Sequence, residues 1–384
     1  MAPYGQPTYL DKVYQILQRY CDGSFSLNMN YLTYHHSHDR AFGSRFIELF
    51  GQPRTPETEF YTESSGLPRG YDPRVLKENM YYADVAASIQ RATEEAMIGL
   101  ARAAYEAHPS KRLCLAGGVA YNCLANTRIL RETPFEELYI QPAAGDSGGA
   151  LGAALYAYHV LLQQPRRFVM EHAYWGAHET PEAIEQTLRQ RGVAYQTFGD
   201  EEALVGTVAR AIADGKVAGW FQGRCEWGPR ALGNRSIIAD PRRADMKEIV
   251  NAKIKFREPF RPFAPSMLAE ATHAFMDLPN RAMHYPAKFM LYVTGVQPAK
   301  QSVIPAVSHM GTARLQTVDA QVNPRYHRLI ARFAEETGVP VLLNTSYNLR
   351  GEPLVNTAAH ALSTFERSGL DLLAFEGRYL VSKG

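Results

Sequence analysis

The sequence predicts an α/β protein built from two domains. Two units of strand, glycine-rich turn and helix follow one another between residues 113 and 159, which is the pattern of an α/β layer. Helical and strand-like segments alternate again from residue 180 to the C-terminus. At 384 residues the chain is longer than one hydrophobic core usually supports. Residues 163–167 (Gln-Gln-Pro-Arg-Arg) interrupt the apolar pattern, so we predict domains at 1–165 and 166–384.

The elements of the first half follow from apolar spacing and glycine turns. From Asp84 to about His108 apolar and small residues recur at helical spacing, and Pro109 ends the pattern. Residues 113–116 form a short apolar run that leads into Gly117-Gly118, which predicts a buried strand and a turn. A second strand at 138–140 leads to the turn Gly145-Asp146-Ser147-Gly148-Gly149 and a helix over 150–159.

The second half shows the same alternation. Thr180-Pro181 predicts an N-cap and first residue of a helix that ends near Gly192, and Asp200 caps another helix that ends near Gly215. A strand is expected at 217–221. Residues 324–337 predict a helix that Gly338 stops, followed by a strand at 339–343 that leads to Asn344-Thr345-Ser346-Tyr347-Asn348.

The composition excludes several classes of protein. Hydrophobic residues make up 46% and charged residues 21% of the chain, as in ordinary globular proteins. A net charge of +2 gives no argument for a nucleic acid or a membrane as partner. The four cysteines are scattered, and no apolar run reaches the ~18 residues of a membrane span. We expect a cytoplasmic protein without nucleic-acid or membrane partners.

Two glycine turns carry candidate ligands. Backbone N–H groups at Gly117 and Gly118 converge where an anion could bind, although a tight turn without a ligand gives the same pattern. Asp146 places one carboxylate at a strand end among small residues. It is a candidate ligand for a hard cation, and capping of the following helix is the alternative.

The segment from Arg224 to Arg261 is strongly basic. It holds ten Lys or Arg residues against five Asp or Glu, a net +5 that exceeds the charge of the whole chain. Residues 242–247 fit a solvated helix face. Prolines and aromatics around Arg230 and around residues 257–263 do not, because they disfavour regular helix and favour partial burial. A polyphosphate or acyl-phosphate site is one interpretation and internal Arg–carboxylate pairs are the other.

Longer motifs resemble the NodU/CmcH family of O-carbamoyltransferases. The resemblance rests on Met1-Ala-Pro-Tyr-Gly5 and on five longer stretches in the family's order: 113–122, 141–154, 221–241, 251–266 and 344–355. Members of the family carbamoylate nodulation factors, cephem antibiotics, novobiocin-type coumarins and tobramycin. The resemblance implies a partial actin-like ATPase-fold (ASKHA) domain over 1–165, followed by a YrdC-like α/β domain over 166–384.

The resemblance also implies an activity. A YrdC-like domain is expected to form carbamoyl adenylate from carbamoyl phosphate and ATP with Mg²⁺, and the ATPase-fold domain to transfer the carbamoyl group to a hydroxyl of a small molecule or glycoside. The K-x-R and S-x-N pattern of such domains appears here as Lys255-Phe256-Arg257 and Ser346-Tyr347-Asn348.

Site residues follow from the same motifs. Lys255, Arg261 and Arg230 are expected to be catalytic through charge neutralisation and alignment. The expected contacts to nucleotide, phosphate or carbamoyl group are Arg257, Arg314, Asn344, Ser346, Asn348, Gly117, Gly118 and Asn122. Asp146 matches the family's metal ligand, for a divalent transition metal such as iron.

The sequence departs from the family pattern in two places. The family's H-x-x-x-H metal pair lies upstream of the Ala-Pro-Tyr-Gly segment with which this chain starts, so we expect the opening part of the first domain to be missing. Asp146 alone is too few ligands for a transition metal. Residues 309–314 also lack the aspartate of the family's H-x-D-G-T-x-R pattern. We therefore expect group transfer to depend on a polypeptide that supplies the missing half-domain. The alternative is that the chain is a non-catalytic partner subunit that binds carbamoyl phosphate and ATP, or a truncated gene product.

Overall fold

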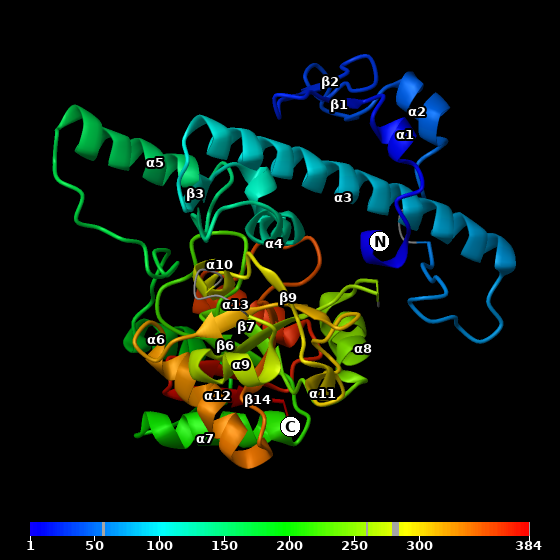
Figure 1. Ribbon diagram of the computed structural model, residues 1–384. Helices are drawn as coiled ribbons and strands as arrows, with labels where there is room; N and C mark the ends of the chain where they lie inside the picture. Colours follow the sequence, from blue (N-terminus) through cyan, green and yellow to red (C-terminus); the bar gives the residue numbers. More distant parts are fainter. Residues whose placement is uncertain (56–57, 259, 279–283, 384) are drawn as a thin grey trace. The chain divides into compact units, whose positions relative to one another are not determined.

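A computed structural model describes residues 1–55, 58–258, 260–278 and 284–383. It divides into two compact units (Figure 1). The first unit comprises residues 1–113 and 127–136, and the second comprises residues 114–126 and 137–384.

The first unit is built on α3 (Pro73–Ala107), a helix of 35 residues. Asp72 caps it by accepting a hydrogen bond from the Arg74 N–H, and Pro73 occupies the first helical position, so the helix begins well before the predicted residue 84. The unit also contains η1 (Ala2–Tyr4), α1 (Leu10–Val13), α2 (Ser44–Phe50) and the paired strands β1 (Leu17–Arg19) and β2 (Phe25–Leu27). Val13, Ile16 and Phe50 pack on Ala92 of α3 as its core.

Both predicted strand–turn–helix units are present, and the first of them is divided between the two compact units. β3 (Arg112–Leu115), whose last two residues belong to the second unit, leads through Gly117 to η2 (Gly118–Tyr121) and α4 (Cys123–Glu132), which belongs to the second unit as far as Asn126. β4 (Glu137–Ile140) leads to α5 (Gly148–Tyr156) and the π-helical turn η3 (Ala157–Leu161). β3 and β4 form a sheet of two strands. These predicted strands and helices are confirmed, but the predicted burial of the first strand is wrong, because none of the four residues of β3 is buried.

An eight-stranded mixed sheet forms the core of the second unit. Its order is β11-β8-β12-β7-β6-β13-β14-β5, and its parallel pairs are β11 with β8 and β13 with β6. Strands β6, β7, β8 and β13 are buried along their whole length. The bounds are β5 (Gln196–Thr197), β6 (Ala218–Phe221), β7 (Arg235–Ala239), β8 (Ala264–Leu268), β11 (Gln316–Val318), β12 (Val341–Ser346), β13 (Leu372–Phe375) and β14 (Tyr379–Ser382).

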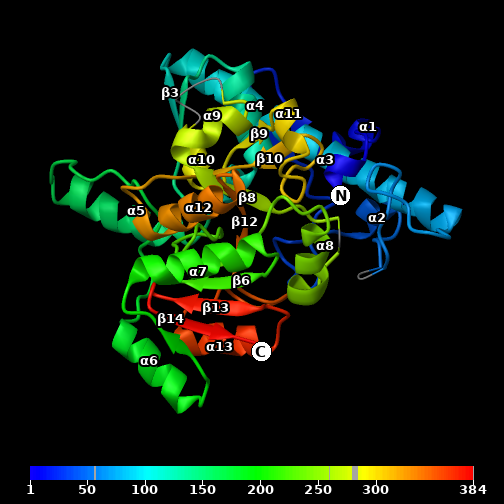
Figure 2. The same ribbon diagram turned by 90° about the horizontal axis from the view of Figure 1, so that it is seen from below.

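Helices cover this sheet (Figure 2). α7 (Glu201–Ala213) lies beside α12 (Pro324–Thr337), which packs on β8 and β12, and α13 (Ala358–Glu366) packs on β6 and β13. The predicted caps are confirmed: Thr180 caps α6 (Pro181–Gln190), Asp200 caps α7, and Gly338 ends α12 with φ +74°. The other elements are α8 (Met246–Val250), η4 (Asn251–Lys255), η5 (Ala269–Ala271), α9 (Thr272–Phe275), α10 (His284–Lys288), β9 (Val293–Gly295), α11 (Pro298–Gln301) and β10 (Thr312–Arg314).

Part of the basic segment is structural. Arg235 begins β7 and is fully buried, where its guanidinium lies 3.5 Å from the ring centre of Phe221 and donates to the carbonyls of Gln222 and Gly223. Arg242 pairs with buried Asp240 at 2.7 Å. The predicted helix face over 242–247 is wrong for most of its length, because turns occupy residues 241–245 and α8 begins at Met246. Internal partners therefore account for these two arginines.

Replacing Arg235 by methionine is expected to lower the free energy of unfolding by about 3 kcal/mol. The substitution removes the hydrogen-bond donor of two buried carbonyls and the positive charge that lies near the buried carboxylate of Glu226. Denaturant unfolding of both proteins measures the difference. The matched control is Arg243→Met, whose exposed pair with Asp245 should contribute within about 0.5 kcal/mol. Equal losses in the two variants would contradict a structural role for Arg235.

No helix in the described ranges combines the length and the apolar character needed to cross a bilayer.

Candidate functional site

Lys255 and the end of β12 come together as the K-x-R and S-x-N motifs predict. The π-helical turn η4 ends at Lys255, and Phe256 follows in the left-handed region at φ +45°, a conformation that a non-glycine residue adopts at a cost. The Lys255 side chain is buried. Its Nζ donates to the Ser346 carbonyl, to Ser346 Oγ at 3.1 Å, and to the carbonyl and Oδ1 of Asn348 at 3.0 and 2.7 Å.

Arg257 lies on the other side of Phe256 and is held by uncharged partners. Its Nε donates to Oδ1 of buried Asn251 at 2.7 Å, and its guanidinium lies 4.8 Å from the ring centre of Phe263. Burial, and then the charge of Arg261, lower the pKa of Arg257 to about 10. Burial, and then the charge of Arg257, lower the pKa of Lys255 to about 7. These three cations are therefore close enough to repel one another.

Arg230 and Arg314 bring two further cations to the same place. Burial, and then the charges of Arg230 and Arg257, lower the pKa of Arg314 to about 10. The Nε atoms of Arg230 and Arg314 are buried without a hydrogen-bond partner. Within the described ranges neither guanidinium forms an ion pair with a carboxylate. Arg230, Lys255, Arg257, Arg261 and Arg314 together form what we call the cation cluster.

Arg261 is the member of the cation cluster that has an internal carboxylate. Its Nε lies 2.9 Å from Glu258 Oε2, and half of its side chain is exposed. One carboxylate therefore faces a group of five cations, and the net charge of the group favours an anionic ligand. The alternative of internal Arg–carboxylate pairs describes Arg242 and Arg261, and it does not describe Arg230, Arg257 or Arg314.

A buried carboxylate fixes the loop that carries Arg230. Glu226 Oε1 accepts from the backbone N–H groups of Leu232, Asn234 and Arg235 at 2.7, 2.8 and 3.2 Å. Gly228 in this loop has φ +131°, and a Cβ atom there would lie 2.6 Å from the Pro142 carbonyl. The loop therefore packs directly against the turn that follows β4.

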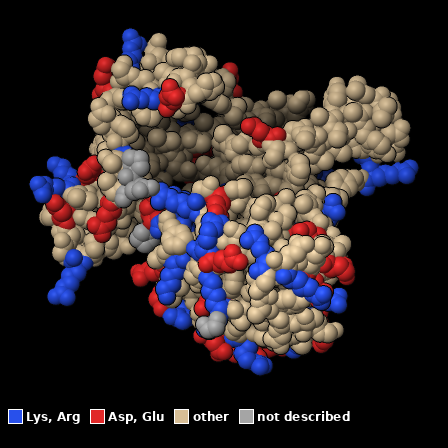
Figure 3. All heavy atoms as spheres, turned by 180° about the vertical axis from the view of Figure 1, so that it is seen from behind, with Lys and Arg blue, Asp and Glu red and all other residues tan. Residues whose placement is uncertain are grey.

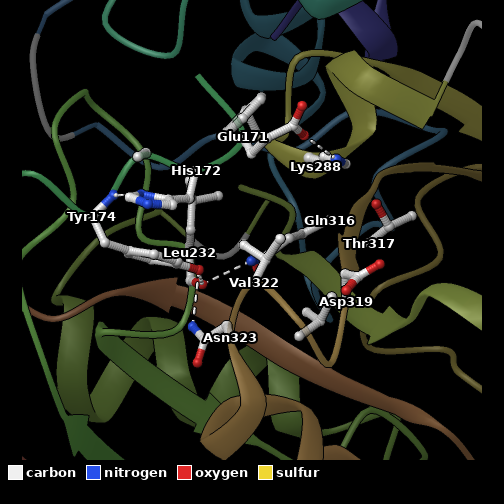
Figure 4. Close-up of a pocket in the computed structure, with 13 residues that line it drawn as sticks. Glu171, His172, Tyr174, Leu232, Lys288, Gln316, Thr317, Asp319, Val322 and Asn323 are labelled. Carbon is white, nitrogen blue, oxygen red and sulfur yellow. Dashed lines mark hydrogen bonds and ion pairs between the residues drawn. The ribbon is translucent and has the colours of Figure 1, made fainter. Parts of the chain in front are cut away.

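The far end of the same loop is held in a small polar pocket (Figure 4). The Leu232 carbonyl accepts from Tyr174 Oη at 2.9 Å and from Gln316 Nε2 at 2.8 Å, and Asn323 Nδ2 donates to Tyr174 Oη at 2.9 Å. Gln316 follows Arg314 by two residues. The same hydrogen-bond network therefore positions residues that are close in sequence to Arg230 and to Arg314. Glu226, Gln316 and Asn251 are supporting residues that no motif in the sequence identified.

Asn344 lies in this supporting layer. Its Nδ2 has three acceptors, the Ala231 carbonyl at 3.1 Å, Ser266 Oγ at 2.9 Å and Gln316 Oε1 at 2.9 Å, while its Oδ1 is buried without a partner. It therefore fixes the residue after Arg230, and its expected contact with a ligand stays a prediction. Ser346 Oγ and Asn348 Oδ1 lie 2.7 Å apart beside Lys255.

The motif around Arg314 forms a hairpin turn. His309 and Thr312 exchange backbone hydrogen bonds of 2.7 and 2.9 Å across Met310 and Gly311, which both have positive φ. This is the geometry of a two-residue primed turn. β10 then delivers Arg314 beside Arg230, although the family's aspartate is absent from the sequence here.

The two glycine turns lie side by side in the second unit. The Gly117 N–H donates to the Ala144 carbonyl at 2.8 Å, and the Gly145 N–H donates to Tyr121 Oη at 2.9 Å. Gly117 needs its φ of +98°, and a Cβ atom at Gly117 or Gly118 would meet open space. Asn122 Oδ1 accepts from the Ala125 N–H at the start of α4. Anion binding at this turn stays a prediction.

Asp146 does not cap α5. Ser147 occupies the N-cap position, and no side chain there accepts a capping hydrogen bond. The Asp146 side chain is exposed and forms no ion pair in the described part of the chain. The described residues include no group of three or more His, Cys, Asp or Glu that could hold a metal ion. The described residues by themselves therefore do not fit a transition-metal centre.

Binding of a phosphate anion beside Lys255 is expected to take up a proton at pH 8. The free Lys255 amine has a pKa of about 7, and an anion raises it by stabilising the ammonium form. Affinity should therefore be highest below pH 7 and fall as the pH rises toward the raised pKa of the complex. Titration calorimetry with inorganic pyrophosphate in buffers of different ionisation enthalpy measures this uptake. Lys255→Met should lose the proton uptake that Lys255 contributes. Equal proton uptake in wild type and variant would contradict the prediction.

The fold and the cation cluster define an α/β protein that gathers five cations near the end of β12, four of them without a carboxylate partner among the described residues. Two family models match this chain: Carbamoyltransferase N-terminus over residues 1–155 and Carbamoyltransferase C-terminus over residues 209–383. The chain belongs to the carbamoyltransferase family, whose members are transferases. Predicted membership of this family is thus confirmed.

Curated relatives support this assignment. An uncharacterised protein of Synechocystis is 42% identical over 98% of this chain and 62% of its own length. The nodulation protein NolNO of Sinorhizobium fredii is 45% identical over 79% of this chain and 44% of its own length. A 3'-hydroxymethylcephem-O-carbamoyltransferase of Amycolatopsis lactamdurans is 34% identical over 71% and 49%. The chain spans about half the length of the curated relatives it matches.

Proposed function

We propose that this chain is an O-carbamoyltransferase whose residues 166–384 activate carbamoyl phosphate with ATP. The observation that carries the proposal is the cation cluster, in which Arg230 and Arg314 form no ion pair with a carboxylate among the described residues. Arginines held in this way suit phosphate oxygens, which a guanidinium binds two at a time. Carbamoyl phosphate and ATP are both phosphate anions, and a similar relative carries the name O-carbamoyltransferase.

In the proposed activation step, water first hydrolyses carbamoyl phosphate to carbamate and inorganic phosphate, and a carbamate oxygen then attacks the α-phosphorus of ATP. An oxygen–phosphorus bond forms to give carbamoyl adenylate, and the bond to pyrophosphate breaks. Arg230 and Arg314 would hold the leaving pyrophosphate. Lys255, beside Ser346 and Asn348, would neutralise charge that develops at the α-phosphate, and Mg²⁺ bound with ATP would supply further positive charge.

Transfer is proposed for the first domain. A hydroxyl of a small molecule or glycoside would attack the carbamoyl carbon, lose its proton and displace AMP, with the turn at Gly117, Gly118 and Asn122 contacting the nucleotide. Asp146 would be one ligand of the family's transition metal, and the remaining ligands would have to come from another polypeptide segment. A second candidate function is therefore that of a subunit that binds carbamoyl phosphate and ATP while a partner protein performs the transfer. The single exposed Asp146 favours it.

The finer architecture belongs to the same proposal. Residues 1–165 would form part of an actin-like ATPase-fold domain and residues 166–384 a YrdC-like domain, in a cytoplasmic protein. The α/β fold supports this assignment, as does the packing of the Gly228 loop on Pro142, which joins the two proposed active regions within the second unit.

Pyrophosphate release tests the proposal. Purified chain with ATP and Mg²⁺ should release pyrophosphate when carbamoyl phosphate is added and not when it is omitted. Release without carbamoyl transfer to any hydroxyl would favour the second candidate. A wild-type chain that binds neither ATP nor carbamoyl phosphate would rule out both.

A further inference from the structure

Phe256 is a large apolar residue at the surface of the cation cluster. It stands between Lys255 and Arg257 in the sequence, and 49% of its side chain is exposed. Its two neighbours direct their cationic groups to partners inside the second unit. Lys255 Nζ bonds to Ser346 at the end of β12, and the Arg257 guanidinium lies over the ring of buried Phe263. Internal packing therefore uses Phe263 and leaves half of Phe256 to the solvent.

The backbone at Phe256 has a conformation that normally selects glycine. η4 ends here with φ +45° and ψ +49°, and the Arg257 N–H closes the turn by donating to the Asn251 carbonyl at 3.2 Å. Left-handed residues at helix ends are usually Gly and sometimes Asn, because a Cβ atom makes this conformation costly. A half-exposed ring offsets little of that cost by packing. Strain that packing does not offset is typical of residues that take part in binding.

The surroundings of Phe256 are positively charged. Burial by itself would raise the pKa of Glu258, but its own backbone N–H and the charges of Arg261 and Arg350 lower this pKa below its usual value. Arg350 is exposed and therefore adds a further cation near Glu258 at the surface. Lys and Arg side chains also gather on the face of the second unit that is seen from behind (Figure 3). An anionic ligand is therefore attracted to this region.

A ligand that is both an anion and a flat apolar ring matches these features. Adjacent Cα atoms are about 3.8 Å apart, so a ligand whose phosphates contact Lys255 or Arg257 can place its remaining part on the Phe256 ring. A nucleotide has such a part, since every base presents a π face that stacks on aromatic side chains. Inorganic phosphates and carbamoyl phosphate have no such face.

We propose that the base of a bound nucleoside triphosphate stacks on Phe256 while its phosphates contact the cation cluster. The inference rests on the proposed function, in which ATP binds at this cluster, and it adds the residue that distinguishes a nucleotide from other phosphate anions. Stacking accepts any base, so Phe256 favours nucleotides over bare phosphates without selecting adenine over guanine. The base takes no part in the bond changes at the α-phosphorus. Phe256 therefore contributes to the affinity for ATP and not to the rate of the chemical step.

Two ligands that differ in the nucleoside test the stacking. ATP and inorganic tripolyphosphate, each with Mg²⁺, are titrated calorimetrically into the wild-type chain and its variants, and only ATP that excess inorganic pyrophosphate displaces is counted. Wild type should prefer ATP, and Phe256→Ala should reduce this preference at least tenfold by weakening ATP binding alone. Phe256→Tyr should keep the preference, whereas Phe256→Leu, which has apolar bulk without a ring, should lose most of it. Phe25→Ala is the control, at a phenylalanine that is 43% exposed in β2 of the first unit, and should bind both ligands as wild type does.

Kinetics give a second measurement of the same effect. In carbamoyl phosphate-dependent pyrophosphate release, Phe256→Ala should raise the KM for ATP at least tenfold and leave kcat within about twofold of wild type. The affinity of each variant for tripolyphosphate should equal that of wild type, which shows that the cation cluster is still folded.

The outcomes separate the stacking from the proposed function. An equal preference for ATP in wild type and Phe256→Ala, or a full preference in Phe256→Leu, would overturn the stacking and leave the proposed function in place. Loss of tripolyphosphate binding in Phe256→Ala would also overturn it, because Phe256 would then support the structure of the cluster. A wild-type chain that binds neither ATP nor tripolyphosphate would contradict the proposed function itself, and the stacking with it.

Discussion

Replacing Lys255 by alanine is expected to lower carbamoyl phosphate-dependent pyrophosphate release at least a hundredfold, because one preorganised cation at a transition state contributes about that much. Its Nζ is fixed by oxygen atoms of Ser346 and Asn348 rather than by a carboxylate, so its charge remains available to a ligand. Initial rates at saturating ATP and carbamoyl phosphate measure the effect. The loss should appear in kcat more than in KM if Lys255 acts on the transition state.

The control is Lys253→Ala. Lys253 lies in the same π-helical turn, is exposed, and makes its described packing contacts through Cβ and the backbone, which alanine keeps. Its rate should remain within about twofold of wild type. Lys255→Met, which retains most of the buried stem, separates loss of charge from loss of packing and should be as inactive as the alanine variant. Full activity in Lys255→Met would remove this residue from the proposed chemistry.

Replacing Arg314 by methionine is expected to abolish pyrophosphate binding while leaving the free protein as stable as wild type or more so. The charge of Arg314 is buried beside Arg230 and Arg257, and burial and this repulsion lower its pKa to about 10. Removing a buried like charge relieves repulsion, whereas removing a paired charge destabilises. Thermal unfolding without ligand should therefore show an equal or higher Tm.

The same experiment with ligand gives the second half of the prediction. Inorganic pyrophosphate at about a hundred times its Kd should stabilise the wild-type protein by about 2.7 kcal/mol and raise its Tm, with no such rise for Arg314→Met. Arg242→Met is the control, because Arg242 pairs with Asp240 and should lose stability but keep the rise with pyrophosphate. A lower Tm for Arg314→Met without ligand would indicate that Arg314 has a structural role instead.

Local sequence signals predicted helices α3, α5, α6, α7 and α12 and strands β3, β4, β6 and β12, which include two of the eight strands of the large sheet. Caps at Thr180 and Asp200 and the stop at Gly338 are short-range hydrogen-bonding and backbone effects, so neighbouring residues suffice to identify them. β7 was missed because Arg235 and the basic residues after it resemble a surface segment, while the structure buries Arg235 against Phe221. Burial of a cation depends on partners distant in sequence.

The sequence predicted the charged residues of the candidate site but did not identify the residues that hold them in place. The K-x-R and S-x-N motifs brought Lys255 and Ser346 together as expected. Glu226 and Gln316 were not identified, because their roles are to hold the backbone at Leu232 through contacts between separate strands and loops. The strand pattern placed Asn344 at the end of β12 but could not show that its amide nitrogen bonds to the Ala231 carbonyl in the supporting layer.

Titration of inorganic pyrophosphate into wild type, Lys255→Met, Arg314→Met and the double variant tests the central claim, that residues from distant stretches bind one anion. The account predicts that wild type binds, that each single variant weakens binding about tenfold or more, and that the two effects do not add, since both side chains contact the same ligand. Absence of binding to wild type, or binding that neither substitution changes, would contradict it.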